Sequence, residues 1–158
     1  VCLVECLLTQ PKGGDPLKPK TRFGQSLHYE VSRHLSDRLR RLLGLYVSVG
    51  HSLDWFWGVD CFFFLGLPRD EKQVQDRGRF FTIDVCAYAK PVWEVRADIL
   101  ITRENLLGKR HDLRKMGVVI ANYFLTGEPL ENPTHFNPGS WRTISGKSKK
   151  RLSEVRSA

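Results

Sequence analysis

The sequence predicts a single α/β domain with a central mixed β-sheet flanked by helices. Apolar residues recur at helical spacing on either side of the central region, and the segments between them have the composition of strands. These strand-like segments are so rich in apolar residues that helices are needed to cover the sheet. A chain of 158 residues with a 41% hydrophobic share can bury such a core. We divide it into an N-terminal segment with a basic loop (1–22), the α/β core (23–127) and a basic C-terminal tail (128–158).

The first element expected is a helix over residues 24–43, where one apolar stripe recurs every three or four positions. The stripe consists of Leu27, Val31, Leu35, Leu39 and Leu42. Gly44 is the expected stop of this helix, and a short strand should follow over 45–49. Glu30 lies at the edge of the stripe.

The aromatic segment 51–58 is expected to form a turn or the entry to a strand. Its adjacent rings, Trp55, Phe56 and Trp57, are of the kind that stack on nucleic-acid bases. Clustered aromatic residues belong to a core more often than to such a platform, so we expect them to be buried.

Two further strands are expected over residues 58–65 and 78–90, joined as a β-hairpin by the polar segment 66–78. The alternation of side chains along the second strand places Asp84, Cys86 and Lys90 on one face. After the proline at position 91, a short strand is expected over 96–102. A last helix should span 112–125 and end at the glycine at position 127.

Two acids interrupt these apolar strands: Asp60 lies in the first strand of the hairpin and Asp84 in the second. If the register places them side by side, their charges repel unless a cation lies between them. Mg²⁺ or Mn²⁺ suits such a pair, because a hard cation takes oxygen ligands from one or two carboxylates and from substrate phosphates. A nearby lysine, for which Lys90 is the candidate, can neutralise charge on a phosphate in the transition state. The pattern therefore points to metal-dependent hydrolysis of phosphodiesters.

The charge of the chain favours a polyanionic partner. The formal net charge is +8 and the isoelectric point is near 9.6, which points first to nucleic acid. The candidates for phosphate contact are Arg110, Arg114 and Lys115 at the start of the last helix and Lys147, Lys149, Lys150 and Arg151 in the tail. No apolar run is long enough to cross a membrane. The four cysteines match no zinc-site spacing, and we expect them to be reduced in the cytoplasm.

The order of these elements and acids resembles the PD-(D/E)XK nuclease superfamily, which has the restriction-endonuclease-like fold. The resemblance covers about residues 24–102 and depends on Gly-Val-Asp before one apolar strand and Thr-Ile-Asp-Val in the next. It implies a DNA endonuclease in which Asp60 and Asp84 bind the metal. By the same resemblance, Glu30 on the first core helix would assist the metal and a downstream lysine would take part in catalysis. A homodimer is left open.

The sequence departs from the family pattern at the lysine. The position two residues after Asp84 is occupied by Cys86, so Lys90 is the candidate for a displaced lysine. Six residues of extended strand span about 20 Å, and Lys90 can reach Asp84 only if the chain bends, for example at 89–91. Too few residues separate Lys90 from position 97 for a parallel crossover, so either the fourth strand is antiparallel or the expected strand ends are wrong.

Two other functions are left open by the sequence. One is a nucleic-acid-binding module on the same fold without catalysis, which Cys86 at the usual lysine position favours. The other is a structural or assembly protein in which both acids are only capped or paired with cations.

Overall fold

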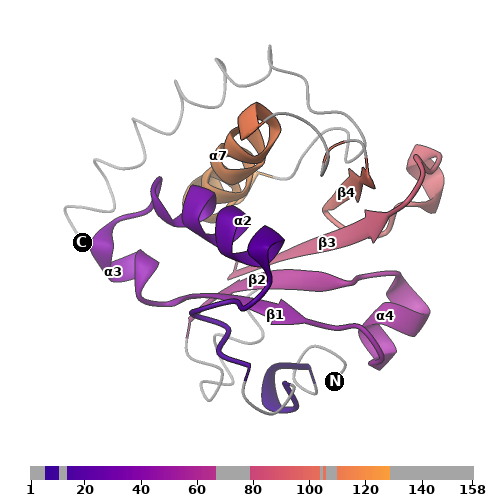
Figure 1. Ribbon diagram of the computed structural model, residues 1–158, viewed down its shortest axis with the longest axis horizontal. Helices are drawn as coiled ribbons and strands as arrows, with labels where there is room; N and C mark the ends of the chain where they lie inside the picture. Colours follow the sequence, from indigo (N-terminus) through magenta and orange to yellow (C-terminus); the bar gives the residue numbers. More distant parts are fainter. Residues whose placement is uncertain (1–5, 11–13, 67–78, 104, 106–109, 129–158) are drawn as a thin grey trace.

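The computed structural model describes residues 6–10, 14–66, 79–103, 105 and 110–128, which form one four-stranded mixed sheet with several helices (Figure 1). The elements in chain order are α2 (Arg22–Ser32), α3 (Asp37–Arg40), β1 (Leu43–Val47), α4 (Ser52–Trp57), β2 (Cys61–Leu65), β3 (Phe80–Cys86), the 3₁₀ helix η2 (Val92–Glu94), β4 (Ile99–Thr102) and α7 (Arg110–Thr126). The predicted α/β class with a mixed sheet is confirmed.

The strand order in the sheet is β1-β2-β3-β4. The first three strands form an antiparallel meander, and β4 lies parallel to β3. The register pairs Cys61 of β2 with Ile83 of β3, and Ile83 with Ile99 of β4. A parallel neighbour requires a crossover, and residues 87–98 between β3 and β4 provide it.

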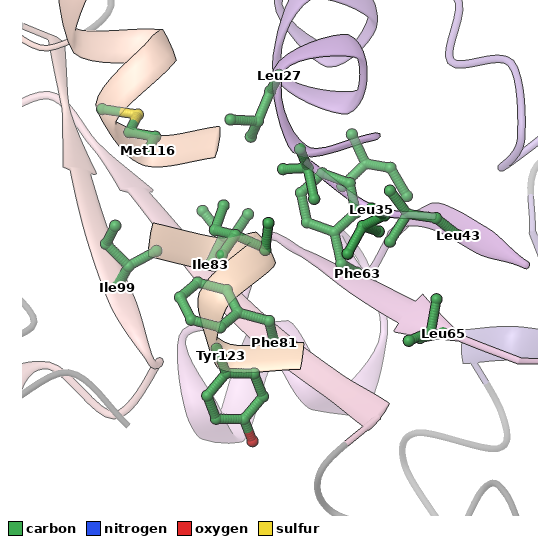
Figure 2. Close-up of a cluster of buried hydrophobic side chains, with 14 of the residues drawn as sticks. Leu27, Leu35, Leu43, Phe63, Leu65, Phe81, Ile83, Ile99, Met116 and Tyr123 are labelled. Atoms are coloured by element: carbon green, nitrogen blue, oxygen red, sulfur yellow. The ribbon is translucent and has the colours of Figure 1, made fainter. Parts of the chain in front are cut away.

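Helices α2 and α7 pack side by side over one face of the sheet (Figure 1). Their apolar stripes meet the strand residues of that face in the main core, part of which Figure 2 shows. The fully buried members from the helices include Leu27 and Met116, and those from the strands include Phe63, Phe81 and Ile83. This layer fixes β2 and β3 beneath the two helices.

The opposite face of the sheet is covered by a second, smaller cluster. It contains Cys6, Leu7, Tyr46, Leu53, Val59, Phe62, Phe64, Phe80 and Ala97. The N-terminal segment is also tied to the edge strand β1, because the Gln10 side-chain amide accepts a hydrogen bond from the Val47 N–H and donates one to the Val47 carbonyl, both at 3.0 Å. Phe80 belongs to this second cluster, whereas Phe81 and Ile83 belong to the main core. The even-numbered residues of β3 therefore face the second cluster, and the odd-numbered residues face the helices.

The helix predicted over 24–43 is in fact two helices. α2 ends at Ser32, and α3 begins after Ser36, whose hydroxyl caps it by accepting the Leu39 N–H. Gly44 lies inside β1 and does not end a helix. The stripe itself was predicted correctly, since Leu27, Val31 and Leu35 are buried.

The bounds of the central elements also differ from those predicted. Residues 51–58 contain a short helix, α4, which Gly58 ends in the left-handed conformation at φ 60°. β3 stops at Cys86, well before position 90, and β4 starts at Ile99. Because β3 ends earlier and β4 starts later than predicted, residues 87–98 are free to form the parallel crossover. The antiparallel alternative for β4 was therefore wrong. The antiparallel pairing of β2 with β3 is confirmed, whereas most of the connecting segment, 67–78, lies outside the described residues.

The last helix agrees with its prediction. α7 spans Arg110–Thr126 and is followed by Gly127 at φ 71°. Within the described part of the chain, no helix is long and apolar enough to span a lipid bilayer.

Candidate active site

Asp60 and Asp84 are neighbours at one end of the β2–β3 pair. Asp60 directly precedes β2, and the pairing of Cys61 with Ile83 places it beside Asp84. The Asp60 N–H donates to the Ile83 carbonyl at 2.9 Å, and the Asp60 Oδ2 accepts the Val85 N–H at 2.6 Å. These two hydrogen bonds, to the residues on either side of Asp84, hold the main chain and the carboxylate of Asp60 against β3.

The two carboxylates share one face of the sheet. Phe81 and Ile83 belong to the core under the helices, whereas Phe80 belongs to the second cluster, so alternation puts Asp84 on the side of that second cluster. The same alternation carries Asp60 to the side of Phe62. The register and the alternation thus place the two acids beside each other and not on opposite faces of the sheet.

Lys90 reaches Asp84 because the chain turns away from the sheet after Cys86. Its Nζ donates to the Asp84 Oδ2 at 2.8 Å, although the two residues are six positions apart. The bend that the sequence required is present, but it begins at the end of β3 and not at 89–91. The amine beside Asp84 is thus supplied by the crossover and not by the strand itself.

Cys86 also contacts Asp84. Its thiol donates to the Asp84 Oδ1 at 3.1 Å, so both carboxylate oxygens of this acid have a donor. Asp84 is only 4% exposed, and a carboxylate so buried requires such donors. Burial raises the pKa of the Cys86 thiol, which keeps it protonated at neutral pH and able to donate.

The charges of the site influence one another. Burial raises the pKa of Asp60, and the neighbouring Asp84 charge raises it further, while the hydrogen bond from the Val85 N–H lowers it. The hydrogen bond with the Asp84 carboxylate raises the pKa of Lys90. Lys90 is therefore a permanent cation beside a pair of acids, one of which is held in an unfavourable environment for its charge.

Two neighbouring carboxylates offer oxygen ligands of the kind that a hard divalent cation takes. Mg²⁺ is commonly bound through one or two carboxylates, with water and substrate phosphates completing its ligands. Burial and the neighbouring Asp84 charge, which both raise the pKa of Asp60, disfavour its ionised form, and a bound cation would offset both effects. Among the described residues, no group of three or more His, Cys, Asp or Glu side chains is arranged to hold a metal. Within the described part of the chain, a bound metal would have only Asp60 and Asp84 as carboxylate ligands.

Glu30 is not brought to this pair. It is buried on α2, where its Oε2 accepts from the Arg33 guanidinium at 3.3 Å. α7 approaches it closely, because a Cβ at Gly117 would lie 2.6 Å from the Glu30 backbone carbon. Both helices cover the face of the sheet opposite to Asp84. The position of Glu30 is explained by helix–helix packing.

Of the predicted phosphate contacts, the two whose side chains the structure describes are separate from the acid pair. Arg114 is exposed and Lys115 is half-buried on α7, which covers the opposite face. Arg110 begins α7, but its side chain is outside the described part. The tail candidates Lys147, Lys149, Lys150 and Arg151 lie beyond the described residues.

Sequence reasoning missed Asp98, which fixes the start of β4 to β3. Its Oδ2 accepts from the Thr82 N–H and hydroxyl, both at 2.7 Å, and its own N–H donates to the Thr82 Oγ1 at 2.9 Å. Sixteen residues separate the two partners, and no spacing pattern predicts such a pair. Thr82 lies two positions before Asp84 on the same face, so this link positions the acid's strand.

Replacing Lys90 by methionine is expected to lower the free energy of unfolding by about 1–2 kcal/mol. The value lies between those of buried and exposed ion pairs, because the Asp84 side chain is 5% exposed and that of Lys90 is 34% exposed. Since the pKa of Lys90 is raised, its contribution is complete below the ordinary value of 10.5 and is lost as the pH rises through the raised pKa. Urea unfolding between pH 6 and pH 9 should give a constant difference from the wild type. Lys20→Met, on an exposed residue, is the control; an equal loss in both variants would contradict the role of the ion pair.

Comparison of the chain with protein-family models, curated proteins and solved structures gives no match.

Proposed function

We propose that the protein is a metal-dependent endonuclease that hydrolyses DNA phosphodiester bonds. One observation carries the proposal: Asp60 and Asp84 adjoin on one face of the sheet, and the Lys90 Nζ lies 2.8 Å from the Asp84 Oδ2. A pair of carboxylates with one fixed cation is the charge pattern that phosphodiester hydrolysis uses. The net charge of +8 suits a DNA substrate.

The proposal extends to the PD-(D/E)XK, restriction-endonuclease-like fold. In that family the first acid opens the second core strand and the second acid lies on the third. Here Asp60 immediately precedes β2 and Asp84 lies within β3. The arrangement of the acids supports the resemblance independently of the lysine spacing, which differs.

Asp60 and Asp84 would hold Mg²⁺ or Mn²⁺, and such an ion supplies Lewis-acid activation and neutralises charge on the scissile phosphate. The Cys86 thiol orients Asp84 by donating to its Oδ1. Lys90, kept protonated by its raised pKa, would balance negative charge that develops on the phosphate oxygens. Glu30 has no part in this proposal, since it lies on the other side of the sheet.

The test is cleavage of a supercoiled plasmid and of a branched DNA by the purified protein in Mg²⁺, Mn²⁺ or EDTA. We expect nicked or linear product with either divalent ion and none with EDTA. Mg²⁺ should also raise the melting temperature of the wild type, because an ion that binds only the folded state stabilises it. Absence of cleavage with every divalent ion would refute the endonuclease.

A second function, DNA binding without catalysis, is favoured by Cys86 at the usual lysine position. Lys90 also already occupies the Asp84 Oδ2, as a structural ion pair would. This alternative predicts salt-dependent DNA binding but no cleavage, and a melting temperature unaffected by Mg²⁺. If binding is absent even at low salt, both nucleic-acid functions fail.

A further inference from the structure

Two segments near the acid pair expose large aromatic side chains. On α4, Trp55, Phe56 and Trp57 are 73%, 67% and 53% exposed, contrary to the burial expected from the sequence. On the crossover after β3, Tyr88 and Trp93 are 84% and 83% exposed. We call these five residues the aromatic rim. Exposed aromatic rings gathered in this way mark a binding surface.

The two segments of the aromatic rim converge on Asp84. Gly58 directly follows Trp57, and a Cβ at Gly58 would lie 4.0 Å from the Asp84 Oδ2. Lys90, between the two exposed rings of the crossover, contacts the same oxygen at 2.8 Å. The Arg96 guanidinium links the segments by donating to the Phe56 carbonyl at 2.8 Å. Both segments lie at the same end of the sheet in Figure 1.

The chemistry of the rim favours nucleic-acid bases over a protein surface. Planar rings bind bases by stacking, which every base permits. Each segment of the rim has a cation: the Arg96 guanidinium donates to the Phe56 carbonyl, and Lys90 lies in the crossover between Tyr88 and Trp93. The net charge of +8 complements a polyanion. The bases must be unpaired, because a base within a duplex has both faces covered by its neighbours.

We propose that the aromatic rim stacks on unpaired bases, so that the preferred substrate is DNA with single-stranded nucleotides beside the phosphate that is cut. The part of this inference that concerns cleavage rests on the proposed function. Stacking itself requires neither metal nor catalysis and can be measured separately.

The experiment measures binding of a fluorescently labelled single strand, and of a duplex of equal length, by anisotropy in EDTA at low salt. Trp93→Ala and Trp55→Ala remove one exposed ring from each segment. Tyr29→Ala is the matched control, because this ring is 58% exposed on α2, over the other face of the sheet. We expect each tryptophan variant to bind the single strand about tenfold more weakly than the control does, with duplex affinity unchanged.

The inference is overturned if the tryptophan variants bind the single strand as tightly as Tyr29→Ala. It is also overturned if light scattering shows a wild-type dimer that becomes monomeric in Trp93→Ala, since a second copy of the chain would then occupy the rim. Failure of the two proposals is distinguishable. Rim-dependent single-strand binding without Mg²⁺-dependent cleavage supports stacking and refutes the endonuclease. Cleavage that is indifferent to both tryptophans refutes the substrate preference and leaves the endonuclease standing.

Discussion

Replacing Asp60 by asparagine is expected to reduce DNA cleavage by about 10³-fold while making the folded protein more stable at neutral pH. The loss follows from removing one of two carboxylates that would hold the metal, whose charge stabilisation is worth several kcal/mol. The gain follows from the raised pKa of Asp60, because its ionised form is disfavoured in the folded state. Asparagine keeps an oxygen that can accept the Val85 N–H, so the backbone contact need not be lost.

The sign of the stability change can be followed with pH. A carboxyl whose pKa is raised on folding lowers stability as the pH rises from its ordinary value, 3.8, through the raised value. Thermal melts in EDTA should show the advantage of Asp60→Asn at neutral pH and its disappearance below about pH 3.8. Mg²⁺ should raise the melting temperature of the wild type and not that of the variant.

Two companion variants make the result specific. Asp84→Ala should lose cleavage as Asp60→Asn does, but it should destabilise the protein, because Lys90 and Cys86 lose their acceptor. Asp54→Asn changes a nearby acid on α4 that lies outside the pair, and it should retain cleavage. Full activity in Asp60→Asn, or equal losses in all three variants, would contradict the proposed metal site.

Replacing Gly117 by alanine is expected to lower the free energy of unfolding by about 2 kcal/mol or more. The added Cβ would lie 2.6–2.7 Å from the backbone carbon, the carbonyl oxygen and the Cβ of Glu30. Backbone atoms cannot move aside as a flexible side chain can, so α2 and α7 must separate and loosen the core beneath them. This cost exceeds the gain of about 1 kcal/mol in helix propensity when glycine becomes alanine.

The measurement is urea unfolding of Gly117→Ala at pH 7. Asn122→Ala on the same helix is the control, since it also gains helix propensity but lies outside this close approach. We expect the control to be as stable as the wild type or slightly more so. A stabilised Gly117→Ala would show that the two helices can separate without loss of packing.

The pairing of the two acids was accessible from the sequence because it depends on local patterns. Asp60 and Asp84 each interrupt an apolar segment, and consecutive strands tend to pair as antiparallel neighbours. The apolar stripes of α2 and α7 were equally visible, because side-chain period is a property of the local backbone. The split between α2 and α3 was missed, although Ser36 carries a capping signal, because the leucine stripe continues across the break.

The sequence by itself determined the α/β class, the mixed sheet, the two acids and the need for the chain to bend before Lys90 could reach them. Only the tertiary structure decided that β3 ends at Cys86, which brings Lys90 to Asp84 and leaves a crossover long enough for a parallel β4. It also placed Glu30 across the sheet from the acids and left the rings of α4 exposed. The physical reason is that a pattern fixes which residues share a face, whereas the choice of what covers that face depends on contacts between distant segments.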